Sequence, residues 1–130
     1  MNSTSPATSV LDEVRTWSGV STQPTPRGST AIVFEGHELG HVHSERGTLD
    51  LPLSDDRRAR VLAAARAKEW FEHWVTKRLA NDGDTEDGIA LLRESYDELR
   101  ANHDRNRTDR SALPRRRIRA TCQRLIRHHS

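Results

Sequence analysis

Residues 37–43 of this 130-residue chain read HELGHVH, and the conformation of these residues decides the fold. The first five letters match the zinc-peptidase pattern H-E-x-x-H. That pattern works on an α-helix, where the two histidines lie one turn apart and share a zinc ion while the glutamate polarises the attacking water. On a β-strand, by contrast, alternate residues point to opposite faces, so the same letters have a different chemical meaning.

The local sequence favours a strand for this motif. Gly36 and Gly40 flank and interrupt it, and a glycine inside a helix costs about 1 kcal/mol relative to alanine. The preceding AIVF (31–34) is a short apolar run with β-branched members, which is typical of a buried strand. We therefore predict that residues 37–43 form a strand. The alternative is a zinc-dependent metallopeptidase built on a helical HELGH (37–41).

Strand geometry changes which side chains of the motif work together. Strict alternation places His37, Leu39, His41 and His43 on one face and Glu38 on the other. His41 and His43 then form an H-x-H pair that can bind a metal ion such as zinc. Because Glu38 would point away from this pair, the peptidase mechanism would fail. In the alternative without a metal, the histidines hydrogen-bond across the sheet or face solvent.

The flanking segments alternate between strand and helix patterns. Further strands are expected at 29–35 and 48–53, helices at 9–17, from 54 onward and at 85–101, and a loop at 21–28. Residues 68–80 fit both a continuing helix, which the periodicity favours, and a strand of β-forming residues. We predict an α+β fold with a small antiparallel sheet and helices packed on one face.

Composition limits the size of this domain. Only 33% of the residues are hydrophobic and 31% are charged, so we expect one small core within residues 9–101, after a disordered N-terminus at 1–8. The single cysteine, Cys122, excludes an intrachain disulfide. The first residues show no signal-peptide pattern, and no apolar run approaches the roughly 18 residues of a membrane span. A cytoplasmic protein is therefore expected.

The charge is divided unevenly along the chain. Residues 1–103 hold 12 basic and 17 acidic residues, whereas residues 104–130 hold nine arginines and two aspartates. We therefore predict that residues 102–130 form a flexible basic linker and tail. Residues 110–130 could bind nucleic acid through phosphate contacts, although they lack interleaved aromatic residues and any recognised motif.

Four stretches in order resemble the luciferase-domain family, a small and largely uncharacterised group. They are Glu38-Leu39-Gly40-His41-Val42-His43, Asp50-Leu51-Pro52, WVTKRL (74–79) and DTEDGIALLRESYDEL (84–99). The resemblance extends from Val10 to Leu99, favours the strand for 37–43, and implies a Trp-led strand followed by a closing helix. The layout is similar to that of frataxin-like domains, by analogy at the level of the fold alone. The resemblance supplies no cofactor.

One departure from the family concerns the segment before the Trp-led strand. The family places a longer, histidine-containing loop there, whereas this chain retains only His73. We predict His41 and His43 as the leading site residues, with Asp50 and His73 as candidate helpers. The alternative without a functional role is that Asp50, which alternates with Leu49 and Leu51, is a solvated aspartate. We expect a domain that binds a small ligand or a protein partner, and the residues leave catalysis open.

Overall fold

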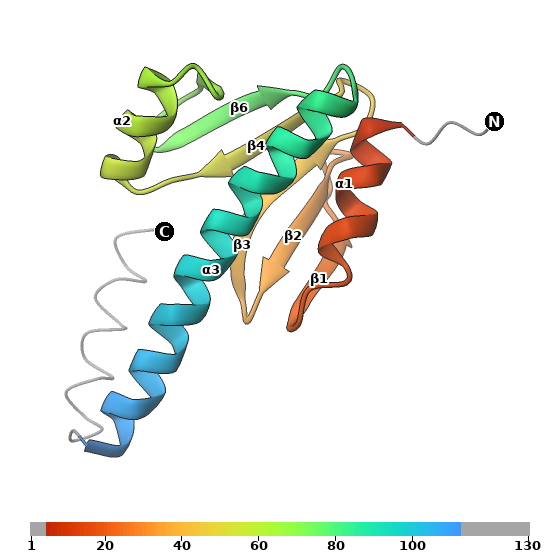
Figure 1. Cartoon of the computed structure of the whole chain (residues 1–130). Coiled ribbons are helices and arrows are strands. Elements are labelled where there is room, and N and C mark those ends of the chain that lie inside the picture. Colours follow the sequence, from red (N-terminus) through yellow and green to blue (C-terminus); the bar gives the residue numbers. More distant parts are fainter. Residues whose placement is uncertain (1–4, 113–130) are drawn as a thin grey trace. The chain divides into compact units, whose positions relative to one another are not determined.

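Figure 1 shows the computed structural model of the chain, which describes residues 5–112. Its elements are α1 (Pro6–Val14), β1 (Val20–Pro24), β2 (Thr30–Phe34), β3 (His37–His43), β4 (Thr48–Pro52), α2 (Asp55–Ala63), β5 (Lys68–Glu69), β6 (Trp74–Arg78) and α3 (Asp82–Ala112). The strands form one antiparallel sheet in the order β1-β2-β3-β4-β6-β5. The predicted α+β class is confirmed, and the motif at 37–43 is a strand.

The chain divides at Tyr96 into two units, and the sheet, α1, α2 and the first part of α3 all belong to the first unit. In that unit α1 and α3 cross the same face of the sheet (Figure 1). The core lies between this face and the two helices, and its largest fully buried side chains are Val10, Val14, Ile32, Leu39, Val42, Leu49, Leu51, Val75, Leu91, Leu92 and Tyr96. The opposite face of β3 and β4 therefore remains available for polar groups.

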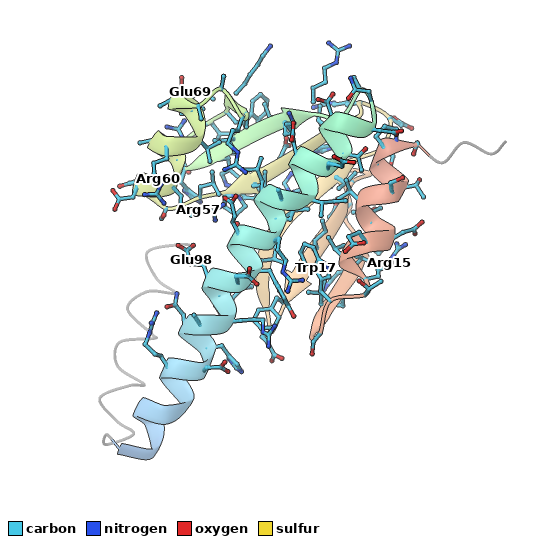
Figure 2. All side chains as sticks on the ribbon, in the orientation of Figure 1. Arg15, Trp17, Arg57, Arg60, Glu69 and Glu98 are labelled. Carbon is cyan, nitrogen blue, oxygen red and sulfur yellow. The ribbon has the colours of Figure 1, made fainter. Side chains whose placement is uncertain are left out.

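Helix α2 is joined to α3 by one buried cation. Arg57, 6% exposed, points toward α3 (Figure 2), where it donates to the Ser95 hydroxyl at 2.6 Å and to the Leu91 carbonyl at 3.3 Å. Arg57 also forms an ion pair with Glu94 at 3.3 Å. This pairing offsets part of the free-energy cost of burying the guanidinium charge. This network fixes α2 at the β6 end of the sheet.

Two predictions near the N-terminus are wrong. Helix α1 begins at Pro6 with Ser5 as its N-cap, so disorder does not extend over residues 6–8. Residues 20–24 form β1 and pair with β2, although a loop is predicted over 21–28. This strand lies at the sheet edge and is mostly exposed, so its sequence lacks the apolar alternation by which a strand is recognised.

The alternatives for 68–80 resolve in favour of strands. Helix α2 ends at Ala63, and Ala65 takes a left-handed conformation with φ 57°, which prevents the helix from continuing. The chain then returns through β5 and β6, and β6 pairs with β4 while burying Val75. Pairing with a neighbouring strand thus outweighs the local helical periodicity.

The closing helix is longer than predicted. Instead of ending at residue 101 before a linker, α3 continues to Ala112. Residues 102–112 contain neither glycine nor proline, and polarity alone does not end a helix. The rest of the predicted basic tail, 113–130, lies outside the described residues. Within the described part of the chain, no helix has the length and apolar character needed to cross a membrane.

Candidate functional site

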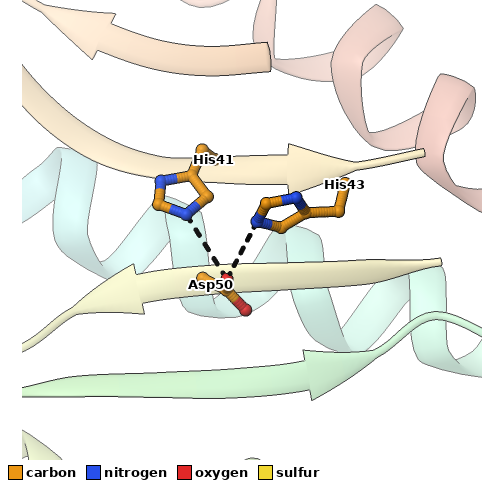
Figure 3. A group of neighbouring side chains, drawn as sticks. All are labelled: His41, His43 and Asp50. Carbon is orange, nitrogen blue, oxygen red and sulfur yellow. Dashed lines mark ion pairs between the residues drawn. The ribbon is translucent and has the colours of Figure 1, made fainter. Parts of the chain in front are cut away.

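Three of the predicted site residues meet on adjacent strands. His41 and His43 lie on β3, and His41 is the register partner of Asp50 on β4. Both Nε2 atoms face the same carboxylate oxygen, Asp50 Oδ2, at 3.3 Å from His41 and 3.2 Å from His43 (Figure 3). One potential ligand atom from each of these three residues lies within 4.8 Å of the other two.

A β-bulge adds a fourth residue to this group. Ile32 pairs with Gly40 but Val33 pairs with Glu38, so Leu39 is an extra residue in β3. The extra residue resets the alternation, and the Glu38 carboxylate lies 2.8 Å from His41 Nδ1. The prediction that Glu38 points away from the histidines is therefore wrong, as is the prediction that Leu39 shares their face, because Leu39 is buried in the core.

The two carboxylates flanking His41 favour its charged form. Hydrogen bonds to Asp50 and then to Glu38 raise the pKa of His41 to about 9, although partial burial opposes this shift. In the protonated state both ring N–H groups donate, one to each carboxylate. His41 is thus an imidazolium at neutral pH in the metal-free protein.

Asp50 is a buried anion held by its neighbours. Burial raises the pKa of Asp50, but hydrogen bonds from His41 and Thr76 outweigh it and hold the pKa below the usual value. The residue is only 5% exposed, so the interpretation as a solvated aspartate is wrong. The sequence placed it on the correct face, opposite Leu49 and Leu51, but did not show what covers it.

Aromatic rings form one side of the site. The Trp74 ring lies 5.0 Å from the His41 ring, and the Phe71 ring stacks on Trp74 at 6.5 Å with an interplanar angle of 15°. Trp70 is in edge contact with Phe71 at 5.8 Å. Trp70 and Phe71 are 48% and 55% exposed, which is unusual for side chains of this size. Trp70 and Phe71 lie in the turn between β5 and β6, and Trp74 is the first residue of β6.

The cluster and the rings border one cavity of about 640 Å³. His41, His43 and Asp50 line its polar side, and Trp70, Phe71 and Trp74 line its aromatic side. The turn between β1 and β2 also lines the cavity, with Arg27 and Ser29. The cavity thus combines flat apolar surfaces with a small group of convergent charged atoms.

Two other histidines do not join the site. His73 is exposed, its ring lies tilted at 6.0 Å from that of Trp74, and it does not line the cavity, so its role as a helper stays a prediction. His37 is exposed at the start of β3. Because a strand rises about 3.3 Å per residue, His37 and His41 are separated by roughly 12 Å, too far to share a zinc ion. The backbone therefore excludes the HELGH metallopeptidase geometry.

Sequence reasoning missed Trp70, Phe71 and Thr76 as site residues, and it considered Glu38 only as the glutamate of the metallopeptidase alternative. The exposed pair Trp70 and Phe71 had a signal, since two large aromatic residues stand in the polar stretch AKEWFEH (67–73). Thr76 had none, because its position depends on pairing between strands distant in sequence, and the place of Glu38 beside His41 depends on a bulge.

Comparison with known families gives a match that covers the residues of this site. Residues 36–95 match the family model of the Luciferase domain. Over these 60 residues the chain is similar to the luciferase domain. The matched segment includes Glu38, His41, His43, Asp50 and Trp74, so the polar cluster and the neighbouring Trp74 ring lie within the matched residues. No curated protein and no solved structure matches the chain significantly. The analogy to frataxin-like domains stays a prediction.

Proposed function

We propose that this luciferase-domain protein binds a small organic molecule in the cavity between the His41 cluster and the aromatic turn. The observation that carries the proposal is the convergence of His41, His43 and Asp50 on one side of a cavity whose other side is aromatic. Small-molecule sites have volumes of roughly 300–1,000 Å³, apolar walls and a few placed polar groups. At about 640 Å³ the cavity is in this range.

The exposed rings indicate how such a molecule would be held. Trp70 and Phe71 present about half of their surface to water, and covering apolar surface gains about 25 cal/mol per Å². A molecule with a flat face can cover these rings while its polar groups meet the charged side of the cavity. Because His41 already donates a hydrogen bond to the Asp50 carboxylate, this side is organised before the ligand arrives.

The three tryptophans provide a built-in test. Trp70 and Trp74 line the cavity, whereas Trp17 is buried beside α1, where its indole Nε1 donates to Glu13 at 3.1 Å. We expect anilinonaphthalene sulfonate, or members of a library of small organic molecules, to shift the indole N–H signals of Trp70 and Trp74 in NMR spectra and to leave that of Trp17 in place.

One variant separates cavity binding from general surface adsorption. Phe71→Ala removes an exposed ring and should weaken binding of the probe at least several-fold without loss of the fold. The Trp17 indole, which contacts Tyr96 in the core, serves as the internal reference. Equal shifts of all three indole signals, or a library in which no molecule moves Trp70 and Trp74, would refute the proposal.

A further inference from the structure

We propose that His41, His43 and Asp50 bind one divalent transition-metal ion at the polar side of the cavity. Two ligand atoms that each lie about 2.1 Å from a metal are about 3.0–3.4 Å apart at octahedral or tetrahedral angles. The observed separations between Asp50 Oδ2 and the two Nε2 atoms, 3.3 and 3.2 Å, fall within this interval. The three side chains point toward a common position (Figure 3).

The surroundings of the three side chains match those of a metal site. A histidine that binds a metal through one nitrogen usually donates its other ring N–H to a carboxylate, which fixes the tautomer and the ring orientation. Glu38 lies in that position, 2.8 Å from His41 Nδ1, and leaves Nε2 directed at Asp50. Thr76 hydrogen-bonds the Asp50 carboxylate and fixes it in turn. Glu38 is therefore a positioning residue in this proposal.

The donor set indicates which metal ions fit. Two imidazoles and one carboxylate suit Zn²⁺, Fe²⁺ or Co²⁺, whereas Mg²⁺ and Ca²⁺ prefer oxygen ligands alone. Three protein ligands leave coordination positions open, as in catalytic rather than structural metal sites. Because the three residues line the cavity, these positions would face its interior. The metal site stands on the ligand geometry alone and does not depend on the small-molecule proposal.

The competing interpretation is a cluster held only by hydrogen bonds between two histidines and a carboxylate. It explains the same distances, but it gives His43 no role in binding metal ions. The two interpretations differ in what the full-length protein does after chelator treatment and dialysis.

The experiment is a titration of the metal-free full chain with Co²⁺ and Zn²⁺. We expect one equivalent of metal ion to bind per chain. Calorimetry measures the binding of Zn²⁺, and visible absorption measures that of Co²⁺. His43→Ala and Asp50→Asn should weaken binding at least 100-fold. Glu38→Gln should weaken it about 10- to 100-fold, because loss of an outer hydrogen bond typically has that effect. A His128→Ala, His129→Ala double variant should bind as the unaltered chain does, which excludes the adjacent tail histidines.

A second measurement keeps the proposal testable if a variant fails to fold. In the unaltered protein, Zn²⁺ should shift the ¹⁵Nε2 signals of His41 and His43 and leave those of His37 and His73 in place. Absence of stoichiometric binding, full binding by a folded Asp50→Asn variant, or shifts at His37 and His73 instead would each overturn the metal site.

Discussion

The glycine inside the HELGH motif provides a sharp test of the strand geometry. A Cβ atom at Gly40 would lie 2.7 Å from the backbone carbonyl oxygen of Asp50 and 3.3 Å from Leu92 Cδ2. Separations below 3.0 Å are not tolerated, and the nearest atom belongs to the backbone of β4 rather than to a flexible side chain. Gly40→Ala must therefore push β3 away from β4, the two strands that hold the His41 cluster.

The magnitude follows from two opposing effects. Overpacking a filled core costs about 1–3 kcal/mol, whereas replacing glycine by alanine gains up to about 1 kcal/mol through the entropy of the unfolded chain. A net loss of roughly 1–2 kcal/mol remains. The unit that contains the sheet ends at Tyr96. For a domain of this size each kcal/mol of lost stability lowers Tm by about 4–8 °C, so the expected fall in Tm is on the order of 10 °C. Displacement of Asp50 should also weaken Zn²⁺ binding.

Thermal unfolding followed by circular dichroism measures the fall, with Gly88→Ala as the matched control. A Cβ at Gly88 would meet only the flexible ends of Leu49 and Leu79, at 3.2 Å. Because Gly88 lies in α3, alanine there gains helix propensity of about 1 kcal/mol, and Tm should stay unchanged or rise. A Gly40→Ala variant that melts as high as the unaltered protein would refute the assigned pairing of β3 with β4.

Three further predictions concern pH, the α2 anchor and the tail. In the metal-free protein, the rise of the His41 pKa from 6.5 to about 9 adds at most about 3 kcal/mol to the free energy of unfolding. This contribution is complete below pH 6.5 and is lost as pH rises through 9. Urea midpoints from pH 6 to 10 should fall accordingly, and an equal fall in His41→Gln would contradict this. Arg57→Met should cost about 1–3 kcal/mol in urea unfolding because Ser95 and Leu91 lose their buried donor, whereas Met at the exposed Arg60 should change stability by less than about 0.5 kcal/mol. Deleting residues 104–130 should leave Tm nearly unchanged and abolish any salt-sensitive binding of nucleic acid; a truncated chain that fails to fold would disprove it.

Strands that bury apolar side chains were predictable, and strands that do not were missed. The runs AIVF (31–34) and TLDLPL (48–53) carry their own apolar pattern, so β2 and β4 follow from local sequence. By contrast β1 and β5 are exposed edge strands whose conformation comes from hydrogen bonds to a neighbour. Residues 74–78 have apolar spacing that fits a helix, yet the pairing of β6 with β4 decides their conformation. Such pairings join residues far apart in the chain, and periodicity does not contain them.

The candidate site also combines features that local sequence predicts with features that only strand pairing determines. The H-x-H pair of His41 and His43 follows from alternation once the strand is known. Asp50 joins it only through the register of β3 with β4, and Glu38 only through the bulge at Leu39. A helix would have made Glu38 the base of a peptidase, and an unbroken strand would have turned it to the opposite face. The single extra residue instead places its carboxylate on His41 Nδ1, where it orients the imidazole toward Asp50. The chemistry of the motif is therefore set by one backbone irregularity rather than by its letters, and a deletion of Leu39 that restores regular alternation should separate Glu38 from His41.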